Sequence, residues 1–305
     1  MSKVLVTGGL GAVGKPLSGE LKRRGHEVWL SDRAHYHEPN YIRCDVGEFH
    51  QVERLLTAAK FDYDYHLAAE FGRQNGEDFY ETLWKSNAIG TKNIIRMQER
   101  LKFRMVFFSS SEVYGDYRGV MSEEVMDKVA IKQMNDYAMT KWVNEMQILN
   151  SAARFGTETV RVRLFNTYGP GEYYSEYRSA ICIFIYRALH DLPYTVYTKH
   201  KRTSSYIDDT VRTLANIAER FKPGEVYNIA GNELHTMKQA SDIILKYLGK
   251  NDSLVEYRDT QEATTLEKKV DNSKAVRDLG HKSKVSLEEG IARTIEWQKE
   301  VYHRG

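Results

Sequence analysis

Thr7-Gly8-Gly9-Leu10-Gly11-Ala12-Val13-Gly14 is the stretch of this sequence that decides its fold. The apolar run at residues 4–6 before it is typical of a buried parallel strand, and residues 16–24 after it read as a helix. Gly25 follows, as a glycine does just past a helix end, and residues 28–30 form a second apolar run. The order strand, glycine turn, helix, strand predicts a β-α-β unit.

The glycines of this turn suit a dinucleotide. Glycine permits a tight turn and a close approach of backbone to a pyrophosphate, and the start of the helix offers unpaired N–H groups. Asp32 lies 18 residues after Gly14, where a carboxylate accepts both ribose hydroxyls of an adenosine and repels a 2′-phosphate. We therefore predict NAD rather than NADP, although Arg33 could tolerate the phosphate. A purely structural turn beside a solvated Asp32 is the alternative. The loop residues expected to bind NAD are Gly8, Gly11, Ala12, Val13 and Gly14.

The alternation of strands and helices continues beyond this unit. Its pattern predicts strands at residues 63–67, 105–108, 159–164 and 226–229, and helices at residues 87–101, 136–154 and 208–221. Strands that alternate with helices in this way form a doubly wound parallel sheet, so the predicted fold class is α/β. The tail from residue 236 is charged and is predicted to be mostly helical.

Two interleaved domains are expected. The alternation weakens after residue 164, where a tyrosine-rich region begins, and it returns near residue 205. We therefore assign residues 1–165 and about 205–230 to a dinucleotide-binding domain, and residues 166–204 and about 231–305 to a smaller substrate domain.

Composition excludes several functions. The 305 residues include 44 Lys and Arg and 42 Asp and Glu, a net charge of +2 that gives no reason to expect a nucleic-acid partner. No apolar run reaches the ~20 residues of a membrane span, and the chain enters its first strand too early for a secretory signal. Two cysteines make a disulfide framework or a cysteine-ligated zinc site unlikely to form, so we expect no metal and a cytoplasmic protein.

Tyr137 and Lys141 lie four residues apart on a predicted helix and share a face. A nearby ammonium favours the phenolate of a tyrosine, whose pKa is ordinarily about 10. Such a pair can remove a proton from an alcohol while hydride leaves for a nicotinamide. Ser109-Ser110-Ser111-Glu112 ends a predicted strand, at the edge where open parallel sheets bind ligands. An ordinary helix face and serines that cap a helix are the alternatives.

With these residues in place, the chain resembles the extended short-chain dehydrogenase/reductase superfamily, specifically its NAD-dependent nucleotide-sugar epimerase/dehydratase family. The resemblance covers nearly the whole chain, and the motifs occur in the family's order. Besides the glycine loop and Ser110, Tyr137 and Lys141, the matching segments are Asp45-Val46, Leu67-Ala68-Ala69, Asn87 to Asn93, Arg163 to Gly171, Tyr206 to Asp209, and Ser286 to Trp297.

The resemblance implies a Rossmann domain, a smaller C-terminal domain that binds a nucleoside-diphosphate sugar, and a homodimer formed through the helices near 87–101 and 136–154. Ser110 would hydrogen-bond the sugar 4-oxygen, Tyr137 would take its proton, and Lys141 would hold the nicotinamide ribose. Further cofactor contacts are implied for Asp45, Val46, Leu67, Ala68, Ala69 and Asn87, and substrate contacts for Asn166, Arg202 and Arg258. Two departures, Thr203-Ser204-Ser205 after Arg202 and Ala138 after Tyr137, leave the sugar and nucleotide open.

Glu112 orders the possible reactions. Every reaction of the family begins with a 4-keto sugar, and family epimerases commonly have a small or hydroxyl residue at this position. A carboxylate there can serve as a base at C5, so the sequence favours a 4,6-dehydratase, with catalytic roles for Ser111 and Glu112. A 4-epimerase ranks second and a UDP-glucuronate decarboxylase third. A dinucleotide-binding regulator without turnover is a remote fourth alternative.

Overall fold

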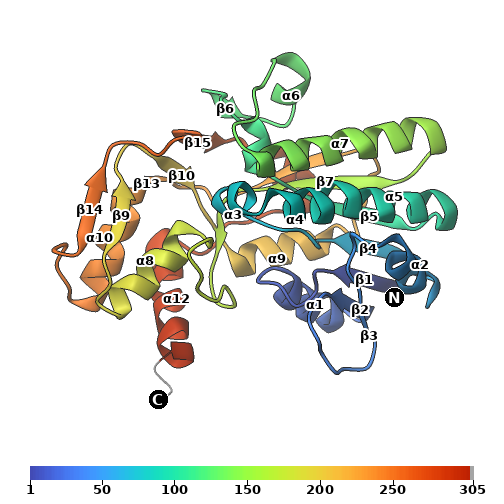
Figure 1. Ribbon diagram of the computed structural model, residues 1–305, viewed down its shortest axis with the longest axis horizontal. Helices are drawn as coiled ribbons and strands as arrows, with labels where there is room; N and C mark the ends of the chain where they lie inside the picture. Colours follow the sequence, from blue (N-terminus) through green and yellow to red (C-terminus); the bar gives the residue numbers. More distant parts are fainter. Residues whose placement is uncertain (303–305) are drawn as a thin grey trace.

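A seven-stranded parallel sheet forms the centre of the computed structural model, which describes residues 1–302 (Figure 1). Its strand order is β12-β7-β5-β4-β1-β2-β3, and every neighbouring pair is parallel. This arrangement confirms the predicted Rossmann-type α/β class. The strands are β1 (Lys3–Thr7), β2 (Glu27–Asp32), β3 (Tyr41–Arg43), β4 (Tyr63–His66), β5 (Arg104–Ser110), β7 (Thr159–Leu164) and β12 (Val226–Ile229).

Helices cover both faces of this sheet, because the sequence of each inner strand is apolar on both sides. In β1, Val4 and Val6 pack in the same core cluster as Leu17, whereas Leu5 between them packs in a second cluster with Val52. Successive side chains of a strand point to opposite faces, so the two clusters lie on opposite sides of the sheet. The first cluster includes residues of α1 (Gly14–Arg23), α9 (Ile207–Asn216) and α11 (Ser273–Leu279), and the second residues of α2 (Phe49–Thr57), α5 (Gly90–Leu101) and α7 (Asp136–Phe155).

The helix predicted over residues 87–101 differs at its start. The segment Lys85–Ile89 is a π-helical turn, continuous with α4 (Tyr80–Trp84) before it and α5 after it. A π-helical turn of this kind is uncommon and frequently occurs at functional sites. The predicted strands 159–164 and 226–229 match β7 and β12 in both bounds.

The C-terminal half carries strands that the sequence did not indicate. The tail expected to be mostly helical includes β14 (Val255–Arg258) and β15 (Glu267–Val270), in addition to α10 (Met237–Leu248), α11 and α12 (Leu287–Tyr302). The segment Glu-Lys-Lys-Val of β15 lacks a hydrophobic alternation, so only its pairing makes it a strand. It lies in a four-stranded sheet of order β13-β10-β15-β6, in which the other strands are β13 (Leu234–Thr236), β10 (Lys201–Thr203) and β6 (Val120–Met121).

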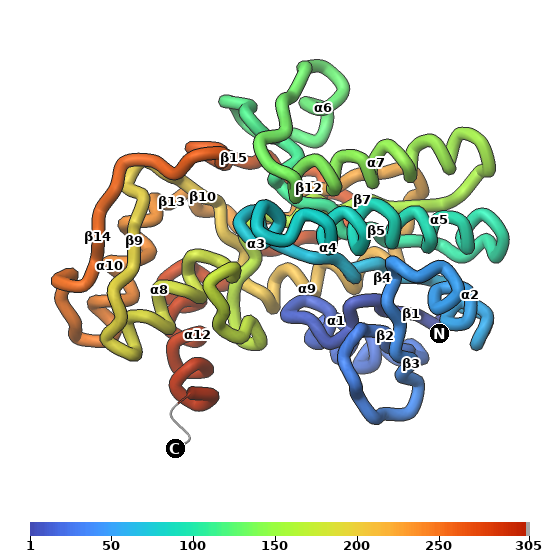
Figure 2. Tube along the Cα trace, viewed as in Figure 1, coloured from blue at the N-terminus to red at the C-terminus, as the bar shows by residue number. Residues whose placement is uncertain are grey.

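The C-terminal elements lie beside one edge of the large sheet (Figure 2). They are α8 (Ala180–Leu189), β9 (Tyr194–Tyr197), α10, β14 and α12. One apolar cluster contains residues of these helices as well as of β1 and α1, so the two parts share a continuous core. The domain boundaries given above stay a prediction. Among residues 1–302, no helix combines the length and apolar character that would let it cross a membrane. The remaining elements are α3 (Arg73–Asp78), η2 (Ser111–Tyr114), α6 (Val125–Lys128), β8 (Thr167–Tyr168) and β11 (Ser205–Tyr206).

Candidate active site

A cleft of about 800 Å³ opens at the carboxyl ends of the central strands. Its walls come from the glycine loop, the end of β5, the start of α7 and the C-terminal elements. The structure therefore brings together most of the side chains that the sequence singled out for chemistry. Those that line the cleft are Ala12, Val13, Ser110, Ser111, Glu112, Tyr137, Asn166 and Arg202.

The glycine loop has the shape that a bound pyrophosphate requires. Gly8 has a φ of +70°, and a Cβ on it would lie 2.8 Å from the backbone nitrogen of Ala68. A Cβ on Gly14 would lie 2.2 Å from the carbonyl oxygen of Gly8. Both positions exclude any other residue, because each added atom would meet backbone. The open side of the loop faces the cleft through Ala12 and Val13, so the residues fit a dinucleotide.

The Asp32 carboxylate is held at the end of β2. Its oxygens accept hydrogen bonds from the backbone N–H groups of Leu10, at 3.2 Å, and Arg33, at 2.8 Å. The Arg33 guanidinium turns instead to Glu70, with an N–O distance of 2.6 Å. A carboxylate fixed beside the glycine loop fits the ribose of NAD, and the pairing of Arg33 removes a cation that could have received a 2′-phosphate.

The other expected cofactor residues frame the same region. Asp45 accepts the backbone N–H of Gly47, and Val46 packs against Gly90, where an added Cβ would lie 2.7 Å from a Val46 methyl. Asn87 is buried within the π-helical turn, and its amide bonds both backbone groups of Glu70. Asn87 thereby holds the loop after β4, which contains Leu67, Ala68 and Ala69. Direct contacts of these residues with NAD stay a prediction.

Tyr137 and Lys141 face the end of β5 from α7. The Lys141 ammonium is buried, donates to the carbonyl oxygen of Phe108 at 2.8 Å, and lies 5.8 Å from the centre of the Tyr137 ring. Burial lowers the pKa of Lys141 to about 8, although the Glu145 carboxylate acts against this. Burial raises the pKa of Tyr137 to about 12, and its hydrogen bond with Ser110 acts in the opposite direction. The triad expected from the sequence is therefore assembled.

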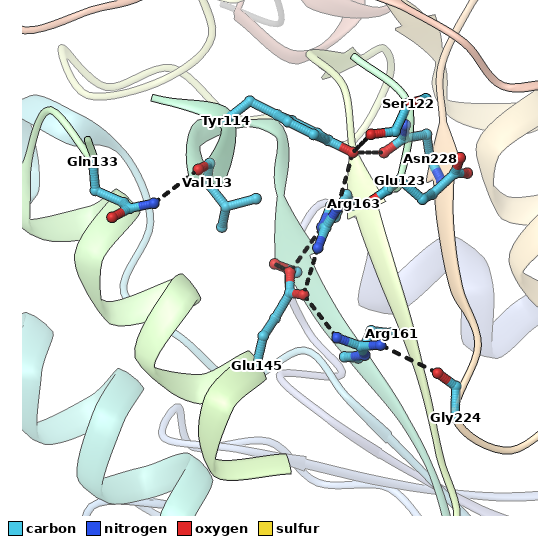
Figure 3. Close-up of polar contacts among 11 residues, drawn as sticks. Val113, Tyr114, Ser122, Glu123, Gln133, Glu145, Arg161, Arg163, Gly224 and Asn228 are labelled. Carbon is cyan, nitrogen blue, oxygen red and sulfur yellow. Dashed lines mark hydrogen bonds and ion pairs between the residues drawn. The ribbon is translucent and has the colours of Figure 1, made fainter. Parts of the chain in front are cut away.

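A buried polar cluster lies behind this triad, and we call it the Glu145 network (Figure 3). Glu145 on α7 accepts two hydrogen bonds from the Arg163 guanidinium, at 3.0 and 2.8 Å, and one from Arg161 at 3.2 Å. Arg163 also donates to the Tyr114 hydroxyl, which donates to Asn228 on β12. Burial acts to raise the pKa of Glu145, but the two arginines outweigh it and lower that pKa. The network fixes α7 against β7 and β12.

Lys268 is the site residue that the sequence did not reveal. It lies on β15, its side chain is 1% exposed, and its ammonium pairs with the Glu112 carboxylate. The same ammonium donates to the Ser111 hydroxyl at 3.2 Å. No motif marks this lysine, because 156 residues separate it from Glu112 along the chain. A charged residue flanked by charged residues in a weak strand pattern reads as solvent-exposed.

The Glu112 carboxylate is held in its ionised form. Burial acts to raise its pKa, but the Lys268 ammonium, together with Arg202, outweighs burial and lowers it. Arg202 lines the cleft and donates to two backbone carbonyl oxygens and to Thr264. Arg73, at the start of α3, lines the cleft as well. Among the residues that the structure describes, no carboxylate forms an ion pair with Arg202 or Arg73, so positive charge is in excess at this end of the cleft.

The two remaining substrate residues have different surroundings. Asn166 lines the cleft with a φ of +41°, and its buried side-chain oxygen has no hydrogen-bond partner within residues 1–302. That oxygen is placed to accept a bond from a ligand. Arg258 instead lies exposed on β14, where it pairs with Glu256 at 2.8 Å, and it is outside the lining of the cleft. The substrate roles of both residues stay predictions.

The chain matches the NAD dependent epimerase/dehydratase family over residues 4–230, and it belongs to that family. A UDP-N-acetyl-alpha-D-glucosaminuronate decarboxylase of Bacillus cytotoxicus is 28% identical, with 98% of each chain covered. UDP-glucuronic acid decarboxylase 1 of Xenopus tropicalis is 29% identical, over 99% of this chain and 73% of its own. The structure of MoeE5 with UDP-glucuronic acid and NAD has a TM-score of 0.88 and 26% identity, covering 98% and 99%. The expected cofactor, NAD, and the nucleotide-sugar enzyme class are thereby confirmed.

Proposed function

We propose that this protein is an NAD-dependent decarboxylase of a UDP-hexuronic acid. The observation that carries the proposal is the ionised Glu112, which lies beside Ser110 and Tyr137 with Arg202 and Arg73 unneutralised nearby. Surplus cations at the sugar end of the cleft favour a substrate whose ring bears a carboxylate. The two decarboxylases among the relatives, both acting on uronic acids by name, support the same substrate class.

The first step is oxidation of the sugar at C4. Bound NAD supplies the hydride acceptor. Tyr137 takes the proton of the 4-hydroxyl, and the Lys141 ammonium beside it stabilises the phenolate that this transfer requires. Ser110, which is hydrogen-bonded to Tyr137, is placed to hold the same sugar oxygen. The product is a ketone next to C5, and the carboxylate on C5 is then a β-keto acid.

The second step is loss of carbon dioxide. The bond between C5 and C6 breaks, and its electron pair moves toward the oxygen on C4, where the Ser110 and Tyr137 hydroxyls can stabilise the enolate. Arg202 is placed to orient the departing carboxylate, and the ionised Glu112 faces the same region. C5 then gains a proton, and the hydride returns to C4.

A decarboxylase explains Glu112 better than the two reactions that ranked above it in the sequence. A 4-epimerase returns hydride to the other face of the ketone and needs no acid or base other than Tyr137. A 4,6-dehydratase needs an acid for the departing water, and the Ser111 hydroxyl bonded to Lys268 is a poor one. The bovine dTDP-D-glucose 4,6-dehydratase is also a more distant relative, at 25% identity.

Product analysis in deuterated water tests the proposal. The protein is incubated with NAD and, separately, with UDP-glucuronic acid, UDP-N-acetylglucosaminuronic acid and UDP-glucose, and products are read by mass and NMR. We expect loss of carbon dioxide from a hexuronic acid and one deuterium at C5. Loss of water from UDP-glucose would instead establish a dehydratase. An unchanged mass with an inverted C4 centre would establish an epimerase.

Glu112→Gln is the matched variant for this assay. It keeps the shape of the side chain but removes the charge, so C4 oxidation should persist while the decarboxylated product forms about 10²–10⁴-fold more slowly. Transient absorbance of the reduced nicotinamide reports the oxidation. Decarboxylation at the wild-type rate in this variant would contradict the role of Glu112.

We further propose that the protein works as a homodimer in the cytoplasm. Exposed apolar side chains gather on α7 and on the π-helical turn beside it, and both cysteines are free thiols. The first feature suits a helical interface and the second suits a reducing compartment.

A further inference from the structure

Decarboxylation consumes one proton per turnover, and this inference rests on the function proposed above. When carbon dioxide leaves, the electron pair left on C5 must be protonated. The proton that Tyr137 took from the 4-hydroxyl is returned to that oxygen when C4 is reduced again, so it is not available to C5. A second donor must therefore reach C5, and it must recover its proton from solvent.

Lys268 holds a proton at the place where this donor is needed. Its buried ammonium is in contact with Glu112, which lines the cleft, and with Ser111. Lys268 itself lies behind Glu112 and is not among the lining residues. A proton can leave Lys268 toward the sugar only through the Glu112 carboxylate.

The charges around Lys268 favour release of that proton. Lys268 on β15 and Arg202 on β10 are register partners in a parallel pair, so the two side chains leave the same face of the small sheet. Burial lowers the pKa of Lys268, and the positive charges of Arg202 and Arg73 lower it further, while Glu112 opposes both effects. His200 nearby has a pKa of about 4, lowered by burial, and is neutral at pH 7.

The charge balance points the same way. Before the reaction, the cations Lys268 and Arg202 face two carboxylates, that of Glu112 and that of the substrate. Loss of neutral carbon dioxide removes one negative charge from this group. Transfer of a proton from the ammonium to C5 removes one positive charge, so the buried group keeps its net charge through the step. A donor that stayed charged would leave an uncompensated cation in a region of low dielectric constant.

We propose that Lys268 is a positioning residue that supplies the C5 proton through Glu112. The ammonium gives its proton to the carboxylate, the carboxylate gives it to C5 as the C–H bond forms, and the neutral amine regains a proton from water after the product leaves. No oxidant or further reactant is needed, because the proton comes from solvent and the electron pair from the broken C5–C6 bond.

Lys268→Arg is the decisive variant, because a guanidinium keeps the positive charge opposite Glu112 but does not release a proton at working pH. With a UDP-hexuronic acid as substrate, we expect C4 oxidation to persist and formation of the final product to fall about 100-fold or more. Reduced nicotinamide should accumulate in the steady state, since return of hydride waits for protonation of C5. Lys269→Arg, at the exposed neighbour on β15, is the matched control and should behave as wild type.

Recovery of wild-type product formation in Lys268→Arg would overturn the proposal, since charge alone would then suffice. The wild-type enzyme gives an independent measurement if arginine does not fit the site. Its product-forming step should slow as pH rises and Lys268 loses its proton, while C4 oxidation does not slow. A product-forming step that is independent of pH up to about pH 10 would also overturn the proposal. Absence of carbon dioxide release by wild type would instead refute the decarboxylase function itself.

Discussion

Glu145 lies one helical turn after Lys141 on α7, and its carboxylate works against the burial that lowers the pKa of that lysine. The helix therefore carries the base, the cation that tunes the base, and the anion that keeps the cation charged, at residues 137, 141 and 145. These residues share one face, because four residues make about one turn. The arrangement leads to the first of four predictions.

Tyr137→Phe should abolish turnover while NAD still binds. The substitution removes only the hydroxyl that takes the proton from the sugar, and we expect kcat to fall by about 10²–10⁴-fold or more with an unchanged Kd for NAD. Product formation and NAD titration measure the two quantities. Tyr80→Phe, at an exposed tyrosine on α4, is the control. Turnover at the wild-type rate in Tyr137→Phe would remove the assignment of the triad.

Gly14→Ala and Gly19→Ala should have opposite effects, although both lie in α1. The new Cβ at residue 14 would lie 2.2 Å from the carbonyl oxygen of Gly8, so the loop must open and NAD affinity should fall by about 100-fold or more. The new Cβ at residue 19 meets nothing within 4 Å. Alanine there should stabilise the fold by about 0.5–1 kcal/mol and leave NAD binding unchanged. Equal NAD affinity in the two variants would contradict the proposed role of the loop.

Asp64→Val should stabilise the protein, increasingly so at higher pH. Asp64 lies in the centre of β4 beside Leu5 and Met105, is fully buried, and has neither carboxylate oxygen hydrogen-bonded to any residue of 1–302. Burial raises its pKa well above 3.8, so the folded state keeps a proton that the unfolded state releases. Stability attributable to Asp64 is therefore lost as pH rises above 3.8.

Denaturant unfolding at pH 5 and pH 8 measures this effect. We expect Asp64→Val to raise the free energy of unfolding by about 1–3 kcal/mol, with the larger gain at pH 8. Asp127→Val, at an exposed position on α6, should show no such gain. A gain that is equal at both pH values would mean that Asp64 does not titrate differently in the folded and unfolded states.

Met146→Glu should separate the proposed homodimer into monomers. Met139, Met146 and Leu149 are each more than 40% exposed along α7, and Ile89 on the π-helical turn is 54% exposed. A charge within this apolar surface cannot be buried without a partner, so association should weaken and the mass from light scattering should halve. Val276→Glu, at an exposed valine on α11, is the control. A monomeric wild-type protein at working concentration would refute the dimer.

The sequence predicted the parts of the site that depend on local pattern. The glycine loop, Asp32 and the pair Tyr137 and Lys141 each lie within one strand–turn–helix unit or one helical turn, where spacing determines geometry. Their positions in the structure follow from these local rules. The large sheet was predictable for the same reason, because buried parallel strands are continuous apolar runs.

The sequence could not predict the parts that depend on long-range pairing. Lys268 reaches Glu112 only because β15 pairs with β10 and β6, and nothing near residue 268 encodes that pairing. Arg258 shows the converse, since its match to the family pattern did not place it at the cleft, and it pairs with Glu256 on the surface. The π-helical turn at Lys85–Ile89 was also missed, because one extra residue in a helical turn leaves no distinct composition.

The Glu145 network lies on the far side of the triad from the cleft, so the machinery for oxidation is anchored separately from the loops that touch the sugar. Segments 71–74 and 172–178 can therefore vary in sequence without loosening α7. A library randomised over those two loops would sample new sugar donors while the hydroxyl-oxidising half stays intact. This chain is accordingly a suitable starting scaffold for evolving altered carbohydrate selectivity.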